Sequence, residues 1–219
     1  MSATWADPEE MARHGRVNPV LAEEFPGLYL RHVAVERGSG RSTRGLKEQL
    51  GMLSDRFGGP QAITMRSRPI PWAYRVFFRH IGLDPDEQPT PVEALTLERM
   101  KKGGFVSQNL LDDALTIAII ESGVALRAFD ADLVSGEPAI RPSLPDEGLE
   151  GRPGDLPSGT LVVADDERPL GLLFGATAAG RGVAPKTART LLVGIGVGGV
   201  PEIAVEEALW SAAEALLST

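Results

Sequence analysis

The sequence contains no cysteine, only three histidines and no long apolar run. Without cysteine the chain has no disulfide, no thiolate nucleophile and no cysteine-ligated zinc. No stretch of about 20 apolar residues is present, so membrane insertion is not expected. The first 16 residues are acidic and polar, whereas a secretory signal peptide begins basic and continues apolar. These absences predict a cytoplasmic protein that is not anchored in a membrane.

The histidines and serines do not form a recognisable catalytic or metal-binding pattern. His14, His32 and His80 are far apart and have no carboxylate at a spacing that shares a helix face, so a zinc site is not expected. No GxSxG motif is present, which argues against a serine triad. We therefore expect no metal and no cofactor, and we assign no catalytic residue.

Charge is divided unevenly along the chain. The net charge is -8, but residues 1–102 contain 15 Lys and Arg against 13 Asp and Glu, whereas residues 103–219 contain 7 against 17. We therefore expect that a surface that binds phosphates would be formed by residues of the first half of the chain. Arg75 and Arg79 are candidates for such contacts, and Lys186 is a further candidate from the second half. The alternative is that these cations are ordinary solvated side chains.

The spacing of apolar residues indicates an α+β fold, with helices first and strands later. We expect helices packed on a mainly antiparallel or mixed β-sheet in a single domain over residues 1–219. Helices are predicted over residues 43–57, 72–82, 91–100, 110–122 and 201–217, and strands over residues 25–37, 124–129, 139–141, 160–164, 170–174 and 190–197.

The segment from Asn109 to Gly123 predicts a helix buried at the centre of the molecule. Asn109 is a suitable N-cap, and Asp112 and Asp113 place negative charge in the first turn. Apolar residues then occupy nearly every direction around the helix axis, as in a helix that packs on most of its sides. Gly123 ends the helix, and a strand follows it.

Two glycine-containing motifs superficially resemble nucleotide-binding loops. GIGVGG (194–199) fits GxGxxG, but no second strand with an acidic residue follows before Thr219. We interpret these glycines as sites of close backbone packing, although an RNA phosphate is an alternative partner. GRGVAPKT (180–187) has proline where a phosphate loop needs its second glycine, so nucleotide hydrolysis is not expected.

Three segments together resemble the B3/B4 domain of the bacterial phenylalanyl-tRNA synthetase β subunit, here as a freestanding protein. They are NLLDDALTIAIIESG (109–123), ALRAFDADLVSG (125–136) and LVVADDERPLGLLFG (161–175). The resemblance extends over residues 70–199, between an N-terminal strand and helix extension (1–69) and a C-terminal helix (200–219). It implies a pocket between the central helix and the sheet that accepts the aminoacyl end of tRNA, where positioned water hydrolyses a mischarged ester.

The resemblance fails at the residues that implement editing in the family. Arg127 occupies the position of the family histidine, and arginine does not act as a general base at neutral pH. The Thr-Asn pair of the family falls near Ala114 and Leu115, and its acidic residue falls at about Val193. We therefore expect the chain to share the fold of the family, and we expect ester hydrolysis less strongly.

We predict a ligand pocket formed by Asn109, Thr116, Arg127, Asp130 and Arg141. Asn109 is alternatively only a helix cap, Asp130 only a turn residue and Arg141 only a surface charge. Arg127 stands on an expected central strand and requires an anionic partner, which is either a ligand or a nearby carboxylate such as Glu121 or Asp130.

Three functional hypotheses follow from these residues. The leading one is binding of tRNA or of an aminoacyl-tRNA 3′ end, with removal of a wrong amino acid in trans by an aminoacyl-tRNA deacylase activity. The second is a non-catalytic module that binds a small amino-acid-like molecule without RNA, which the acidic second half favours. The third is an enzyme for another substrate that uses Arg127 and Asp130.

Overall fold

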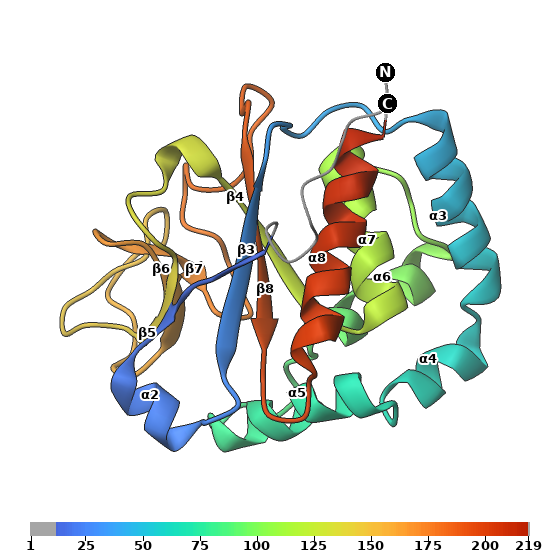
Figure 1. The fold of residues 1–219 in the computed structure, drawn as a ribbon. Helices are drawn as coiled ribbons and strands as arrows, with labels where there is room; N and C mark the ends of the chain where they lie inside the picture. Colours follow the sequence, from blue (N-terminus) through green and yellow to red (C-terminus); the bar gives the residue numbers. More distant parts are fainter. Residues whose placement is uncertain (1–11, 219) are drawn as a thin grey trace.

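Two four-stranded sheets and a group of helices form three layers in the computed structural model, which describes residues 12–218 (Figure 1). The first sheet has the order β1-β3-β8-β4 and is antiparallel throughout. In the second sheet, of order β2-β5-β6-β7, β2 is parallel to β5 and the other pairs are antiparallel. The strands are β1 (Arg13–His14), β2 (Arg16–Val17), β3 (Tyr29–Val35), β4 (Ala125–Asp130), β5 (Ala139–Pro142), β6 (Leu161–Ala164), β7 (Pro169–Leu172) and β8 (Thr190–Gly196).

The helices are α2 (Pro19–Glu24), α3 (Arg44–Arg56), α4 (Gly59–Met65), α5 (Pro69–His80), α6 (Pro91–Lys102), α7 (Leu110–Ser122) and α8 (Glu202–Leu217), with a short 3-10 turn, η1 (Ala131–Leu133). Helices α3, α6, α7 and α8 form the layer on the face of the first sheet that is turned away from the second sheet. Helix α8 packs on β8 and β3, and α7 lies between α8, α3, α6 and β4. Figure 1 shows α5 along one end of the layers and α2 beside the second sheet. The predicted α+β class is confirmed.

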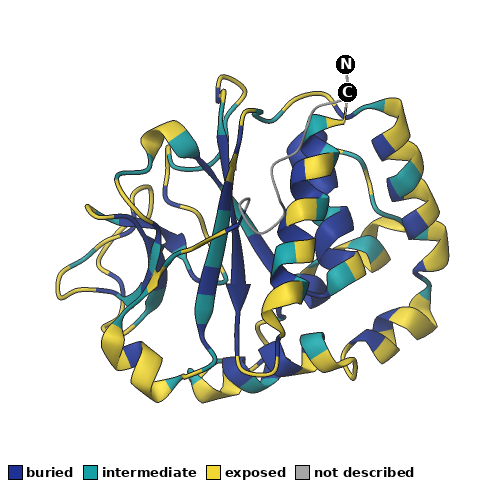
Figure 2. Cartoon of the chain, in the orientation of Figure 1, coloured by how far each residue is buried: buried dark blue, intermediate teal, exposed yellow. Residues whose placement is uncertain are grey.

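The central helix α7 has the caps that its sequence predicts. The Asn109 side chain accepts a hydrogen bond from the Asp112 main-chain N–H at 2.9 Å, and Gly123 ends the helix with a φ of 78°. Asp113 is buried and accepts hydrogen bonds from the hydroxyls of Ser42 and Ser107. In Figure 2 the helix is buried along most of its length, as expected for the centre of the core.

The glycines of 194–199 allow close packing around β8. A Cβ atom on Gly194 would lie 2.5 Å from Val205 Cγ1 of α8, and one on Gly196 would collide with the ring of Tyr29. Every residue of β8 is buried. These contacts support the interpretation of close packing, because the missing side chains let α8 and Tyr29 approach the strand.

A buried tyrosine of α5 joins the ends of two strands in the first sheet. The Tyr74 hydroxyl donates to the Ile195 carbonyl oxygen at 2.5 Å and accepts from the Ala125 N–H at 3.1 Å. Tyr74 is 1% exposed, so water does not replace these bonds. Helix α5 is thereby fixed to the end of β4 and β8.

Several details of the sequence prediction were wrong. The strands divide between two sheets, and the expected single sheet is not formed. Helices α2 and α4 were not predicted. Gly58 is the N-cap of α4, and Gly59 begins this helix, where only the end of the preceding helix was expected. Arg75 was expected at the surface, as a phosphate contact or a solvated side chain, but it is buried, whereas the apolar Trp72 of the same helix is 49% exposed. The reason is that Glu93 and Asp86 neutralise Arg75 within the fold.

Candidate functional site

Arg127 extends from β4 into the space between the two sheets. Its guanidinium donates hydrogen bonds to the carbonyl oxygen of Leu172, to that of Leu173 at 3.4 Å and to the Thr177 hydroxyl at 2.8 Å. It also lies 5.3 Å from the centre of the Phe129 ring. Arg127 therefore ties the first sheet to the turn that follows β7 in the second sheet.

The positive charge of Arg127 is not neutralised by a carboxylate of residues 12–218. Asp130 accepts hydrogen bonds from the Thr187 hydroxyl and the Asp132 N–H, and Glu121 pairs with Arg56. Of the two alternatives for the partner of Arg127, the structure therefore excludes a carboxylate such as Asp130 or Glu121. Burial lowers the pKa of Arg127 to about 10, which still leaves it protonated at neutral pH.

Two of the positions where the chain departs from the family's editing residues lie opposite each other. Arg127 of β4 pairs with Val193 of β8 in the antiparallel ladder. Directly paired residues share one face of a sheet, and the neighbouring Gly194 is turned towards α8. Arg127 and Val193 consequently face the second sheet. Ala114 belongs to α7 on the other face, so the structure does not place it beside them.

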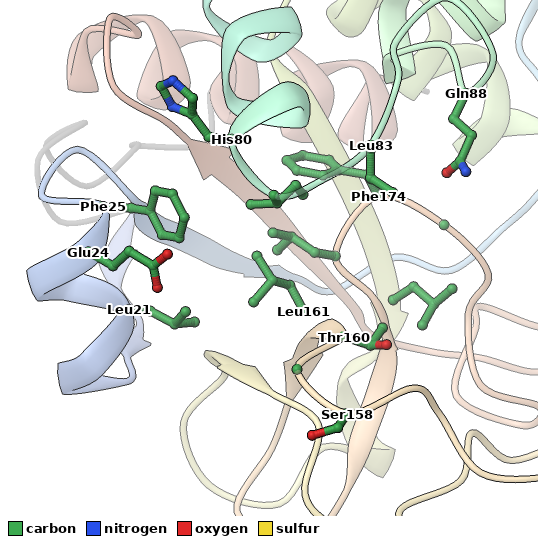
Figure 3. A pocket seen from close by; sticks show the side chains of 15 residues that line it. Leu21, Glu24, Phe25, His80, Leu83, Gln88, Ser158, Thr160, Leu161 and Phe174 are labelled. Carbon is green, nitrogen blue, oxygen red and sulfur yellow. The ribbon is translucent and has the colours of Figure 1, made fainter.

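The turn bound by Arg127 forms one wall of a cavity of about 580 Å³ (Figure 3). A cavity of this size is within the range of small-molecule sites. The wall contributed by the turn begins at Leu172 and ends at Gly175. The other walls come from the end of α2, the end of α5 with the loop that follows it, and the turn before β6. The lining residues are Leu21, Glu24, Phe25, His80, Ile81, Leu83, Gln88, Ser158, Gly159, Thr160, Leu161, Leu172, Leu173, Phe174 and Gly175.

Aromatic packing holds the turn in place. The Phe174 ring lies 5.0 Å from that of Phe78, 5.9 Å from Tyr74 and 6.0 Å from Phe77, measured between centroids. Phe77 in turn contacts Phe25 edge to face at 5.2 Å. Because aromatic contacts at these distances are favourable, the cavity wall is fixed from one side by α5 and from the other by Arg127.

The remaining residues of the predicted pocket lie apart from Arg127. Asn109 caps α7, and Thr116 borders a small hollow of about 30 Å³ with residues of α6. Asp130 closes the turn that follows β4. Arg141 forms a double hydrogen bond with Glu147, at 2.7 Å for each nitrogen. The structure does not bring these side chains together into one pocket.

The three predicted phosphate contacts differ in their accessibility. Arg75 is buried and pairs with Glu93 and Asp86, each at 2.6 Å, so it is not free to meet a phosphate. Arg79 is partly exposed and stacks over Trp72 at 5.8 Å. Lys186 is exposed. Arg79 and Lys186 stay candidates for contact with RNA.

Little in the sequence indicated the cavity. Its residues come from four separate segments, of which the α2 segment was not predicted as a helix. The apolar run before Gly175 was the only available signal, and it was interpreted as part of a strand. Among residues 12–218, no cluster of three or more His, Asp or Glu is placed to hold a metal ion. In the same part of the chain, no helix combines the length and apolarity needed to cross a bilayer.

Comparison with known proteins relates part of this chain to one enzyme subunit. No protein-family profile matches it. The chain is 36% identical over 94 residues to the phenylalanine–tRNA ligase β subunit of Xylella fastidiosa (strain Temecula1). The matched region covers 42% of this chain and 12% of that subunit. The same subunit of Legionella pneumophila (strain Lens) is 34% identical over 88 residues, with coverages of 37% and 11%. That of Shewanella oneidensis is 33% identical over 88 residues, with coverages of 38% and 11%.

These matches span only about a ninth to an eighth of the length of the relatives. Phenylalanine–tRNA ligase is another name for phenylalanyl-tRNA synthetase, so the comparison agrees with the resemblance noted in the sequence. The similarity is limited to part of each protein. The chain thus contains a domain related to part of the phenylalanine–tRNA ligase β subunit.

Proposed function

We propose that this chain is a freestanding B3/B4-type domain that binds the 3′ end of an aminoacylated tRNA, with the aminoacyl group in the cavity beside the β7 turn. The turn of residues 172–177 carries the proposal. It is a wall of the cavity, and it is also the partner of Arg127, the residue at the position of the family histidine. The relation to the synthetase β subunit supports tRNA as the source of the ligand.

Binding is the primary activity in this proposal, and hydrolysis is secondary. Arg127 stays protonated at neutral pH, and Val193 has no ionisable group, so neither is a general base. Both positions are opposite each other on the sheet and face away from α7. Removal of a wrong amino acid in trans would therefore depend on water oriented by other groups, and we expect it to be slow.

Filter binding of uncharged and aminoacylated tRNA tests the proposal. We expect tighter binding of aminoacylated tRNA, and an affinity that falls as salt rises, because phosphate contacts release counterions. Deacylation of a panel of mischarged tRNAs, measured in parallel, reports hydrolysis separately. Equal binding of charged and uncharged tRNA would exclude the aminoacyl group as the recognised element.

A second candidate is a module that binds a small amino-acid-like molecule and no RNA. The excess of acidic residues in the second half of the chain favours it, because a negative surface repels phosphates. The same filter assay separates the two candidates. Absence of salt-dependent tRNA binding, together with binding of a small molecule, would favour the second candidate over the first.

A further inference from the structure

The cavity beside the β7 turn has an uneven charge. Among the described residues that line it, Glu24 and His80 are the only ionisable ones, and the other polar side chains are those of Gln88, Ser158 and Thr160. None of these lining residues is a lysine or arginine. A carboxylate without a permanent cation beside it attracts a positively charged ligand and repels a negatively charged one.

The orientation of the two ionisable side chains favours the carboxylate as the recognition group. In Figure 3 the carboxylate of Glu24 extends from the end of α2 towards Leu161, whereas the imidazole of His80 points away from Leu161 and Phe174. The cavity also lies at the carboxyl-terminal end of α5, a helix of 12 residues. Carboxyl ends of helices carry partial negative charge and favour cations.

Aromatic rings complete a surface suited to an organic cation. Phe25 follows Glu24 directly, and its ring lies beside the carboxylate in Figure 3. Phe174 supplies a second ring on the opposite wall, fixed by Tyr74, Phe77 and Phe78. Aromatic faces attract ammonium groups and also pack against apolar bodies.

We infer that the cavity binds a small amine whose cationic nitrogen is attached to an apolar or aromatic body and which carries no free carboxylate. The nitrogen lies near Glu24 and Phe25, and the apolar body lies against Leu161, Leu172 and Phe174. A free amino acid is disfavoured, because its carboxylate meets no permanent cation among the lining residues. The inference rests on the proposed function in that both use the same cavity, but it concerns the cavity's own chemistry and requires no RNA.

Titration of the full chain with three matched probes tests this inference. Phenethylamine carries only the cation, 3-phenylpropanoate carries only the anion, and phenylalanine carries both. Binding is measured by calorimetry or by NMR at pH 7 for the wild type and for Glu24→Gln. Glu23→Gln is the matched control, because Glu23 is an exposed acid on the same helix that does not line the cavity.

We expect phenethylamine to bind the wild type and Glu23→Gln with equal affinity, and to bind Glu24→Gln about fivefold more weakly, the effect of losing one partly exposed ion pair. The other two probes should bind the wild type less tightly than phenethylamine. Equal affinity of Glu24→Gln and Glu23→Gln, tighter binding of 3-phenylpropanoate, or no binding of any probe would overturn the inference. Amine binding without tRNA binding would support the inferred amine site and refute only the proposed function.

Discussion

Replacement of Arg127 by methionine tests whether an unneutralised charge lies between the two sheets. Methionine keeps the length and apolar body of the side chain but removes the guanidinium. It deletes the hydrogen bonds to Leu172, Leu173 and Thr177 and also removes a cation that has no carboxylate partner among the described residues. These two effects have opposite signs.

Their magnitudes are similar. Burial lowers the pKa of Arg127 to about 10, and this shift corresponds to a cost of about 3 kcal/mol for the charged form. Three hydrogen bonds contribute about 1 kcal/mol each. The free energy of unfolding should therefore change by less than about 1.5 kcal/mol in Arg127→Met at pH 7. Because the folded-state pKa is lowered, the cost to the wild type is present at neutral pH and disappears as the pH rises above about 10 towards the pKa of an unperturbed arginine.

Urea unfolding followed by circular dichroism at pH 7 measures this change, and filter binding measures the effect on aminoacylated tRNA. We expect the affinity for aminoacylated tRNA to fall although the free energy of unfolding changes little, because the β7 turn loses one of its two supports. Arg127→Ala should likewise lose more in tRNA affinity than in the free energy of unfolding. A loss of more than about 3 kcal/mol in Arg127→Met would mean that the charge is well compensated in the wild type and would refute the reasoning. Unchanged tRNA binding by either variant would refute the assignment of Arg127 to the site.

Three further predictions concern the packing and charges of the scaffold. Tyr74→Phe should lower the free energy of unfolding by about 2 to 4 kcal/mol in urea titrations, because two buried main-chain groups lose their partner; a loss near zero would show that they find another. Gly194→Ala should cost about 1 to 3 kcal/mol by the same assay, because its Cβ atom meets Val205 at 2.5 Å, and a stabilised variant would contradict this packing. The hydrogen bond from Arg141 lowers the pKa of Glu147, so their pairing stabilises the fold above the unfolded pKa and is lost as the pH falls through the folded one. Arg141→Gln should therefore reduce the loss of stability in acid unfolding curves below about pH 5, and curves parallel to those of the wild type would contradict it.

Local signals in the sequence were sufficient for most helices and strands. The cap of α7 follows from Asn109 and Asp112, and its end follows from Gly123, because the physical cause lies within a few residues of each boundary. The C-terminal helix α8 follows in the same way from its apolar spacing. The helix α4 was missed because Gly58 and Gly59 are equally suitable for ending one helix and for beginning another.

Long-range pairings were the part that the sequence did not reveal. Arg75 was expected at the surface, as a phosphate contact or a solvated side chain, yet Glu93, 18 residues further on, makes its burial acceptable. The partners of Arg127 are carbonyl oxygens 45 and 46 residues away, and every main-chain carbonyl has the same chemistry, so residue types contain no signal for them. The candidate cavity was missed for a related reason, since its walls meet only in the folded chain.

The short strands β1 and β2 flank a single residue, Gly15, yet they belong to different sheets. β1 covers the outer edge of β3, and β2 covers that of β5, so one five-residue segment occupies an edge in both sheets. Exposed strand edges are templates for pairing with other chains. Removal of residues up to Val17 would therefore uncover two edges at once, and self-association through β3 and β5 would be the characteristic failure of a chain truncated at this point.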